Sequence, residues 1–182
     1  MNEKRGLKIV FYISIIAIIL FAYLVNVHYK PSQSRFCDIS EGISCDIVNK
    51  SLYSEVFGIP VSLLGVLFFA LVAFLTWKLL KNKKIKFFSL ELHKKEVLEL
   101  LLLFMVISTL FSLWLVYAEL FLILSICLLC VVGDVLIWTA LFVLIELNKK
   151  YIKHSLISIS RILLIIFGAI ILYLWYAIIV EL

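Results

Sequence analysis

Two cysteine pairs are the residues of this chain best suited to chemistry. Cys127 and Cys130 form a Cys-x-x-Cys pair inside a long apolar run, and Asp134 follows one turn later. On a helix, residues at i, i+3 and i+7 lie on one face, so the two thiols and the carboxyl would share it. Ionisable groups inside an apolar span are costly and tend to be functional. The other pair, Cys37 and Cys45, lies in a polar segment and completes the chain's 4 cysteines.

Two pairs of thiols are suited to thiol–disulfide exchange, in which one dithiol reduces another through a mixed disulfide. A pair in an exposed loop can react with a soluble protein, whereas a pair within a membrane can react with a lipid-soluble electron acceptor such as a quinone. A zinc site built from all four cysteines is the main chemical alternative. We favour the redox interpretation and predict no metal, because four thiolates around one ion are costly to bury among Leu, Ile and Val.

The composition indicates an integral membrane protein. Of the 182 residues 65% are hydrophobic, and the mean hydropathy is +1.18, whereas a soluble domain is nearer to half apolar. The formal net charge of +5 does not indicate a nucleic-acid partner. The basic residues cluster in short loops between apolar spans, which is how membrane proteins distribute them.

The apolar stretches predict an all-α membrane protein with one domain, residues 1–182. The run from Val97 to Leu147 has about 50 residues. At about 1.5 Å per residue it is far too long for a hydrocarbon core of about 30 Å. We therefore place a tight turn near Glu119, which divides the run into two spans. The five predicted spans are residues 7–27, 59–80, 97–116, 121–147 and 155–180.

The cysteine loop, residues 28–58, follows the first span, and we expect its second half to form a short helix at the membrane interface. Positive charge favours the cytoplasmic side of a membrane. Of the 17 Lys and Arg residues, only Lys30, Arg35 and Lys50 fall on the side of this loop. We therefore predict a multi-pass protein of the inner or plasma membrane, with a cytoplasmic N-terminus and an extracytoplasmic loop. Cys127 lies about 10 Å from the predicted outer turn, within reach of the loop.

The chain resembles the vitamin K epoxide reductase family in its bacterial and archaeal branch. The resemblance rests on the pattern Cys-Asp-x-Val-x-x-Ser-x-Tyr-Ser-x-x-Phe-Gly-Ile-Pro from Cys45 to Pro60, on the preceding Cys37, and on the later Cys127-x-x-Cys130. It covers roughly residues 7–147. The resemblance implies a four-helix transmembrane bundle around a quinone pocket, capped by the extracytoplasmic cysteine loop with its short helix. The fifth transmembrane helix would be an addition to this bundle.

The resemblance also implies an activity, that of a membrane thiol:quinone oxidoreductase. Such an enzyme reoxidises a thioredoxin-like partner outside the cytoplasm, here expected as a separate protein, and so supports disulfide bond formation. By position, Cys37 would react with that partner. Cys45 would pass the electrons to Cys127, and Cys130 would face the quinone, which is menaquinone or ubiquinone. Ser51 matches the serine that the family places near the active-site pair.

Two further residues are candidate quinone contacts. Phe57 lies at the junction of loop and bundle, where a quinone contact and a core contact are equally consistent with the sequence. Asp134 stands where the family would have an uncharged or weakly polar residue. Three interpretations of Asp134 are open. It is a neutral acid that donates a hydrogen bond to a quinone oxygen, a proton donor during quinone reduction, or a polar residue that pairs with a serine or threonine of a neighbouring helix. The available partners for the last alternative are Ser108, Thr109 and Ser112.

Two other classes of protein stay open at this point. A small membrane transporter would use Asp134 as its coupling site, but the cysteine pairs would then be unexplained. A scaffold protein would carry a static Cys37–Cys45 disulfide. Substitution of the cysteines by alanine distinguishes these alternatives, because transport should tolerate it and thiol oxidation cannot.

Overall fold

Four long apolar helices make up most of the computed structural model, which describes residues 2–30, 37, 42–81, 85–87, 90–92 and 94–149. About 20 apolar residues suffice to cross a membrane as a helix, and each of these four is long and apolar enough. The described residues thus confirm the predicted all-α membrane fold. The predicted fifth span, residues 155–180, lies outside them. The helices are α1 (Glu3–Tyr29), α3 (Val61–Leu80), α4 (Lys94–Tyr117) and the Cys130 helix (Leu128–Lys149).

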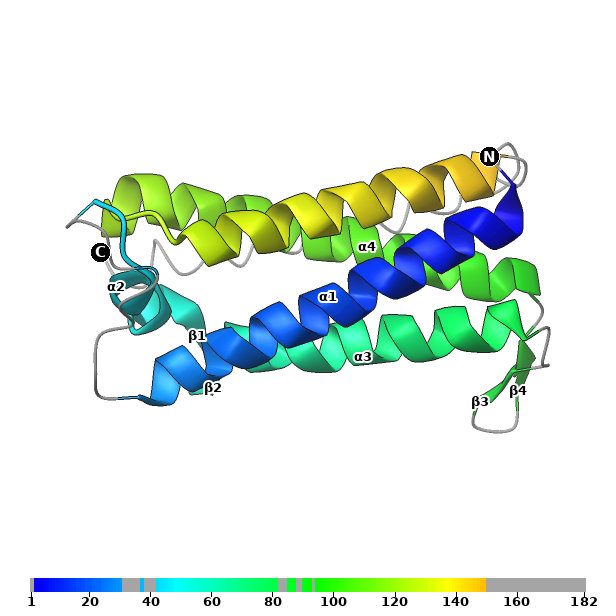
Figure 1. The fold of residues 1–182 in the computed structure, drawn as a ribbon, viewed down its shortest axis with the longest axis horizontal. Coiled ribbons are helices and arrows are strands. Elements are labelled where there is room, and N and C mark those ends of the chain that lie inside the picture. The colour runs from blue at the N-terminus through cyan, green and yellow to red at the C-terminus, as the bar shows by residue number, and fades with distance from the viewer. Residues whose placement is uncertain are drawn as a thin grey trace, which may run out of the picture. The chain divides into compact units, whose positions relative to one another are not determined.

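Short elements join these helices at both ends of the bundle (Figure 1). At one end, the cysteine loop contains a short helix, a 3-10 turn and an antiparallel hairpin, and at the other end a second hairpin precedes α4. The elements are α2 (Cys45–Asn49), η1 (Leu52–Ser54), β1 (Glu55–Val56) paired with β2 (Ile59–Pro60), and β3 (Ile85–Phe87) paired with β4 (Leu90–Leu92).

Helix α2 occupies only the start of the segment that we expected to be helical. Serine side chains explain where it ends, since a hydroxyl that bonds a nearby carbonyl competes with the helical N–H. Ser51 Oγ donates to a carbonyl three residues earlier at 2.8 Å, and Ser54 Oγ donates to the Asn49 carbonyl at 2.7 Å. Phe57, with a φ of 54°, then helps to turn the chain back from β1 into β2.

The break between the third and fourth helices falls later than the predicted turn near Glu119. Helix α4 continues into a π-helical turn, η2 (Ala118–Ile123), and the chain is then non-helical from Leu124 to Cys127. Leu124 has a left-handed backbone with a φ of 56°, where the helix ends. Glu119 is only 6% exposed. An acid inside an apolar run suggested a surface turn, but a buried acid is tolerated where it is hydrogen-bonded.

Phe21 of α1 is a point at which three helices pack closely. Its ring stacks on that of Phe69 in α3, with the ring centroids 5.8 Å apart. A Cβ added to Gly65 of α3 would lie 2.9 Å from the Phe21 ring, and one added to Gly133 of the Cys130 helix would lie 3.1 Å from it. Small residues of this kind let membrane helices approach closely. The two glycines therefore make room for the Phe21 ring.

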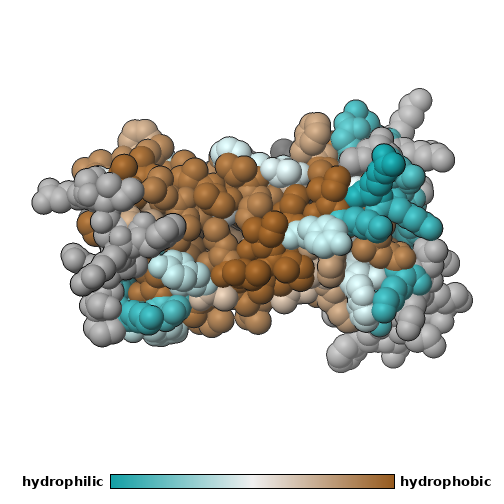
Figure 2. Space-filling model, viewed as in Figure 1, coloured by the Kyte–Doolittle hydropathy of each residue, from teal (hydrophilic) through white to brown (hydrophobic). Residues whose placement is uncertain are grey.

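The outer surface of the bundle is apolar along the middle of the helices. Figure 2 shows a broad hydrophobic band between hydrophilic residues at the two ends. Large side chains such as Ile19 of α1 and Phe142 of the Cys130 helix are each 66% exposed. A soluble monomer rarely exposes an apolar patch of this extent, whereas lipid tails solvate it. The protein is therefore a multi-pass membrane protein.

We predict that Gly65→Ala destabilises the bundle. Overpacking costs about 1–3 kcal/mol, which exceeds the roughly 1 kcal/mol that alanine gains over glycine in helix propensity. Thermal unfolding in detergent should show a lower midpoint, and the additional change Phe21→Leu should recover part of the loss. Gly42→Ala is the matched control, because a Cβ there meets no atom within 4 Å. Equal midpoints for the two alanine variants would contradict this packing.

Candidate active site

A short backbone bridge holds the cysteine loop against the start of the Cys130 helix. Ile43 and Ile126 form a parallel β-bridge. The Ser44 N–H donates to the Ile126 carbonyl at 3.1 Å, and the Ile126 N–H donates to the Gly42 carbonyl at 3.0 Å. Cys45 follows directly after Ser44, and Cys127 directly after Ile126. The bridge therefore brings these two cysteines together.

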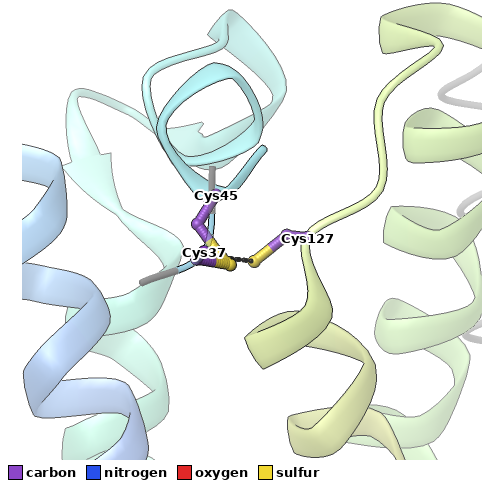
Figure 3. Close-up of side chains that lie close together, drawn as sticks. All are labelled: Cys37, Cys45 and Cys127. Carbon is purple, nitrogen blue, oxygen red and sulfur yellow. Dashed lines mark hydrogen bonds between the residues drawn. A yellow bond between two sulfur atoms is a disulfide. The ribbon is translucent and has the colours of Figure 1, made fainter. Parts of the chain in front are cut away.

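Three of the four cysteines meet beside this bridge. Cys37 and Cys45 form a disulfide, and Cys127 Sγ lies 3.1 Å from Cys45 Sγ. Figure 3 shows the Cys127 side chain directed at the disulfide from the start of its helix. All three residues are buried, with at most 1% exposed. Because exchange begins when one sulfur attacks another, this contact is the geometry of a sulfur pair before a mixed disulfide.

Cys127 also caps the Cys130 helix. Its carbonyl accepts a hydrogen bond from the Val131 N–H at 3.0 Å, and its Sγ accepts one from the Cys130 N–H at 3.2 Å. A side-chain acceptor that reaches the third N–H of a helix is a common way to begin one. Both cysteines are free thiols, Cys127 buried and Cys130 partly exposed. The pair thus presents one sulfur to the loop and leaves the other more accessible.

The spacing of these sulfurs resembles that of a metal site. The Sγ atoms of Cys37, Cys45 and Cys127 all lie within 4.8 Å of one another. Zinc prefers thiolate ligands, and the disulfide ties up two of the three sulfurs. In this redox state, the arrangement is suited to sulfur exchange rather than to metal binding.

Asn49, at the end of α2, lies beside the thiols and was not identified from the sequence. Its buried amide donates to the Cys45 carbonyl at 3.0 Å. The same nitrogen lies 3.7 Å from Cys127 Sγ and 4.0 Å from Cys130 Sγ. An N–H donor near both sulfurs stabilises negative charge that forms on either of them. The only sequence signal was that Asn49 lies inside the long motif, since its side-chain direction depends on the tertiary fold.

Helix α2 is held in place from two sides. His28 of α1 contacts the Asn49 carbonyl through Nδ1 and lies 3.3 Å from Glu55 Oε1 through Nε2. The Ser44 Oγ caps the start of α2 by accepting from the Ile47 N–H at 3.2 Å. These contacts orient the Asn49 side chain toward the sulfurs by fixing the helix that carries it.

The three predicted quinone contacts occupy different surroundings. Ser51 is half-buried at the end of α2, and Phe57 is fully exposed at the β1–β2 turn. The exposure excludes the core alternative for Phe57. Asp134 accepts a hydrogen bond from Ser112 of α4. It therefore bridges two helices, as expected for a polar residue that pairs with a serine of a neighbouring helix. Contacts of Ser51, Phe57 and Asp134 with a quinone stay predictions.

Removal of the Asn49 amide should make the free thiols less reactive. A hydrogen bond to a charged group contributes about 1.5 kcal/mol, and roughly 1.4 kcal/mol corresponds to a factor of ten in an equilibrium or rate constant. We therefore expect Asn49→Leu to slow alkylation of Cys127 and Cys130 three- to tenfold at pH 7. Mass spectrometry after timed reaction with a small apolar maleimide measures the rate. Lys50→Leu is the control, because the Lys50 side chain pairs with Asp46. An equal fall in both variants would show that Asn49 acts only through the stability of α2.

The sequence of the chain matches the model of a known protein family. The model of the vitamin K epoxide reductase family matches residues 8–145, a range that contains both cysteine pairs. No curated protein matches the chain at a significant level. The family couples thiol–disulfide chemistry to quinones in membranes, which fits the juxtaposed sulfurs between membrane-spanning helices. The match confirms the resemblance noted in the sequence and covers most of the chain, so the protein belongs to the vitamin K epoxide reductase family and is a membrane oxidoreductase.

Proposed function

We propose that the protein reoxidises a thioredoxin-like partner outside the cytoplasm and passes the electrons to a quinone. The observation that carries this proposal is the 3.1 Å contact between Cys45 Sγ and Cys127 Sγ. It joins a disulfide in the loop to a free thiol at the start of a membrane helix. A static disulfide in a scaffold protein would not require a thiol at this position.

The electrons pass through the two cysteine pairs by successive exchanges. The partner dithiol reduces the Cys37–Cys45 disulfide and becomes a disulfide itself. The Cys45 thiolate then attacks Cys127 Sγ of the oxidised membrane pair, which forms a Cys45–Cys127 disulfide and releases Cys130 as a thiolate. Attack of the Cys37 thiolate on Cys45 Sγ releases Cys127. The structure corresponds to the end of this sequence, with the loop oxidised and the membrane pair reduced.

The surroundings of Cys130 suit an apolar electron acceptor. Cys130 is partly exposed, and its neighbours Leu128, Val131 and Val132 are each at least 41% exposed. These side chains would hold a quinone ring near the thiol by apolar contact. A quinone, menaquinone or ubiquinone, supplies the capacity to accept two electrons and two protons, which is what the dithiol releases when its disulfide reforms.

The orientation of the chain is part of the proposal. The cysteine loop and the N-terminus of α1 lie at opposite ends of the bundle (Figure 1). Basic residues are concentrated near the N-terminus and in the segment before α4, which supports a cytoplasmic location for that end. The loop then faces the oxidising side of the cell membrane, where partner proteins acquire disulfides.

Trapping of the exchange intermediate tests the electron path. A Cys37→Ala variant lacks the thiol that resolves the mixed disulfide in the forward direction, so we expect Cys45 joined to Cys127 in membranes after free thiols are blocked. Non-reducing mass spectrometry detects this link. The matched control is the double variant Cys37→Ala, Cys127→Ala, which should leave Cys45 free. If Cys45 is also free in the single variant and Cys127 is never oxidised, the path is wrong.

An isosteric change separates a purely structural role of Asp134 from a role in proton transfer. Asp134→Asn keeps an oxygen that accepts from Ser112 but cannot give up a proton. If the residue only bridges the helices, quinone reduction should stay within about threefold of the wild type, while Ser112→Ala lowers the unfolding temperature. A fall of more than tenfold with unchanged stability would instead assign proton transfer to Asp134, since general acid catalysis contributes about 100-fold or more.

A further inference from the structure

Glu119 is a buried acid for which the proposed electron path provides no role. It lies in the π-helical turn η2 with 6% of its surface exposed. Its Oε2 accepts a hydrogen bond from the backbone N–H of Cys127 at 3.2 Å. Its carboxyl also lies close enough to the Cys130 thiol for the two groups to interact electrostatically. A single acidic side chain thus binds the backbone of Cys127 and acts on the thiol of Cys130.

The local backbone departs from a regular helix where Glu119 faces the thiols. The Glu119 carbonyl accepts from the N–H groups of Leu124 and Ser125, the latter at 3.2 Å, which closes a turn wider than that of an α-helix. Such π-helical turns are frequent at functional sites. Leu124, with a φ of 56°, adopts a conformation that is costly for a leucine and persists only when its surroundings enforce it.

A structural role alone does not require an acid at this position. The Cys127 N–H needs only an oxygen acceptor, which the amide of a glutamine supplies without a buried ionisable group. Ionisable groups inside membrane proteins are costly and mark functional sites. The additional property of a carboxyl is that it exchanges a proton, and the Cys130 thiol gains or loses a proton in every catalytic cycle.

We propose that Glu119 exchanges protons with Cys130 during the oxidation and reduction of the membrane pair. This inference rests on the proposed function. When the Cys45 thiolate attacks Cys127 Sγ, the Cys127–Cys130 bond breaks and its electron pair leaves on Cys130 Sγ. The neutral Glu119 carboxyl gives this thiolate a proton and becomes a carboxylate. Of the two protons released by the loop thiols, one goes to the Cys127 thiolate and the other to the aqueous phase. Glu119 therefore stays a carboxylate until the membrane pair is next oxidised, and protons and electrons balance.

The same group acts in the opposite sense when the pair is oxidised. The Cys130 thiol gives its proton to the Glu119 carboxylate, and the resulting thiolate is the more reactive electron donor. The two electrons pass to the quinone as the bond to Cys127 forms, and the quinone takes up the proton of the Cys127 thiol and one proton from the aqueous phase. Glu119 is then neutral again for the next cycle. Asn49, whose amide nitrogen lies 4.0 Å from Cys130 Sγ, stabilises the thiolate while it exists. Asp134 and the Cys130 thiol are titratable groups that act on Glu119, so each contributes to the pH dependence.

The variant Glu119→Gln separates proton exchange from structure, because glutamine retains the acceptor for the Cys127 N–H. The experiment uses the full chain in lipid nanodiscs, reduced with dithiothreitol, desalted, and mixed with a short-chain benzoquinone. We expect single-turnover oxidation of the thiols to fall about 100-fold at pH 7, as for the loss of a general acid–base group. The rate should also become proportional to hydroxide concentration, since the thiol must then ionise without help. Glu119→Asp should recover part of the rate.

Two controls make the outcome decisive. Glu99→Gln removes an acid from the same helix, about 30 Å from Glu119 along its axis, and should leave rate and pH profile unchanged. The Cys45–Cys127 link should still form in the Cys37→Ala, Glu119→Gln variant, which shows that the sulfurs keep their positions. An unchanged rate for Glu119→Gln, or loss of the link, overturns the role of Glu119. Failure of the link in the Cys37→Ala protein itself would overturn the proposed function.

Discussion

The parallel bridge between Ile43 and Ile126 is the interaction on which the arrangement of sulfurs depends. It consists of a pair of backbone hydrogen bonds, each contributing about 1 kcal/mol net. The side-chain contacts of the site are all built around it. Because Cys45 lies two residues after Ile43 and Cys127 directly follows Ile126, a displacement of the bridge by one residue would separate the two sulfurs. A small amount of β structure in an otherwise helical protein thus controls the reactive distance.

Hydropathy predicted the helices well because the membrane imposes a length and an apolar composition on each of them. The predicted spans 7–27 and 59–80 agree closely with α1 and α3. The turn after the third span was misplaced, since an acid in an apolar run was taken to mark the surface. Glu119 instead lies inside, where a backbone N–H satisfies it. A hydrogen bond between residues eight positions apart across a non-helical segment leaves no periodic signal in the sequence.

The reactive cysteines could be predicted because their residue type and pairing carry the chemistry. The Cys37–Cys45 disulfide and the nearby Cys127 thiol agree with the predicted proximity of the two pairs. The catalytic roles of the four cysteines stay predictions. Asn49 and Glu119 could not be found in the same way. Amide and carboxyl groups are common near the ends of membrane helices, and only the orientation of α2 and the wide turn of η2 direct these two at the sulfurs.

The capping role of Cys127 has a consequence for the energetics of the membrane pair. Its sulfur accepts the Cys130 N–H, and a sulfur committed to a disulfide is a poorer acceptor than a free thiol or thiolate. An N-cap interaction contributes about 1 kcal/mol, which for a two-electron couple corresponds to about 20 mV. The cap therefore raises the midpoint potential of the pair, because it stabilises the reduced form. In the proposed electron path, the first turn of a membrane helix would thereby add to the driving force that moves electrons from the loop to the membrane pair.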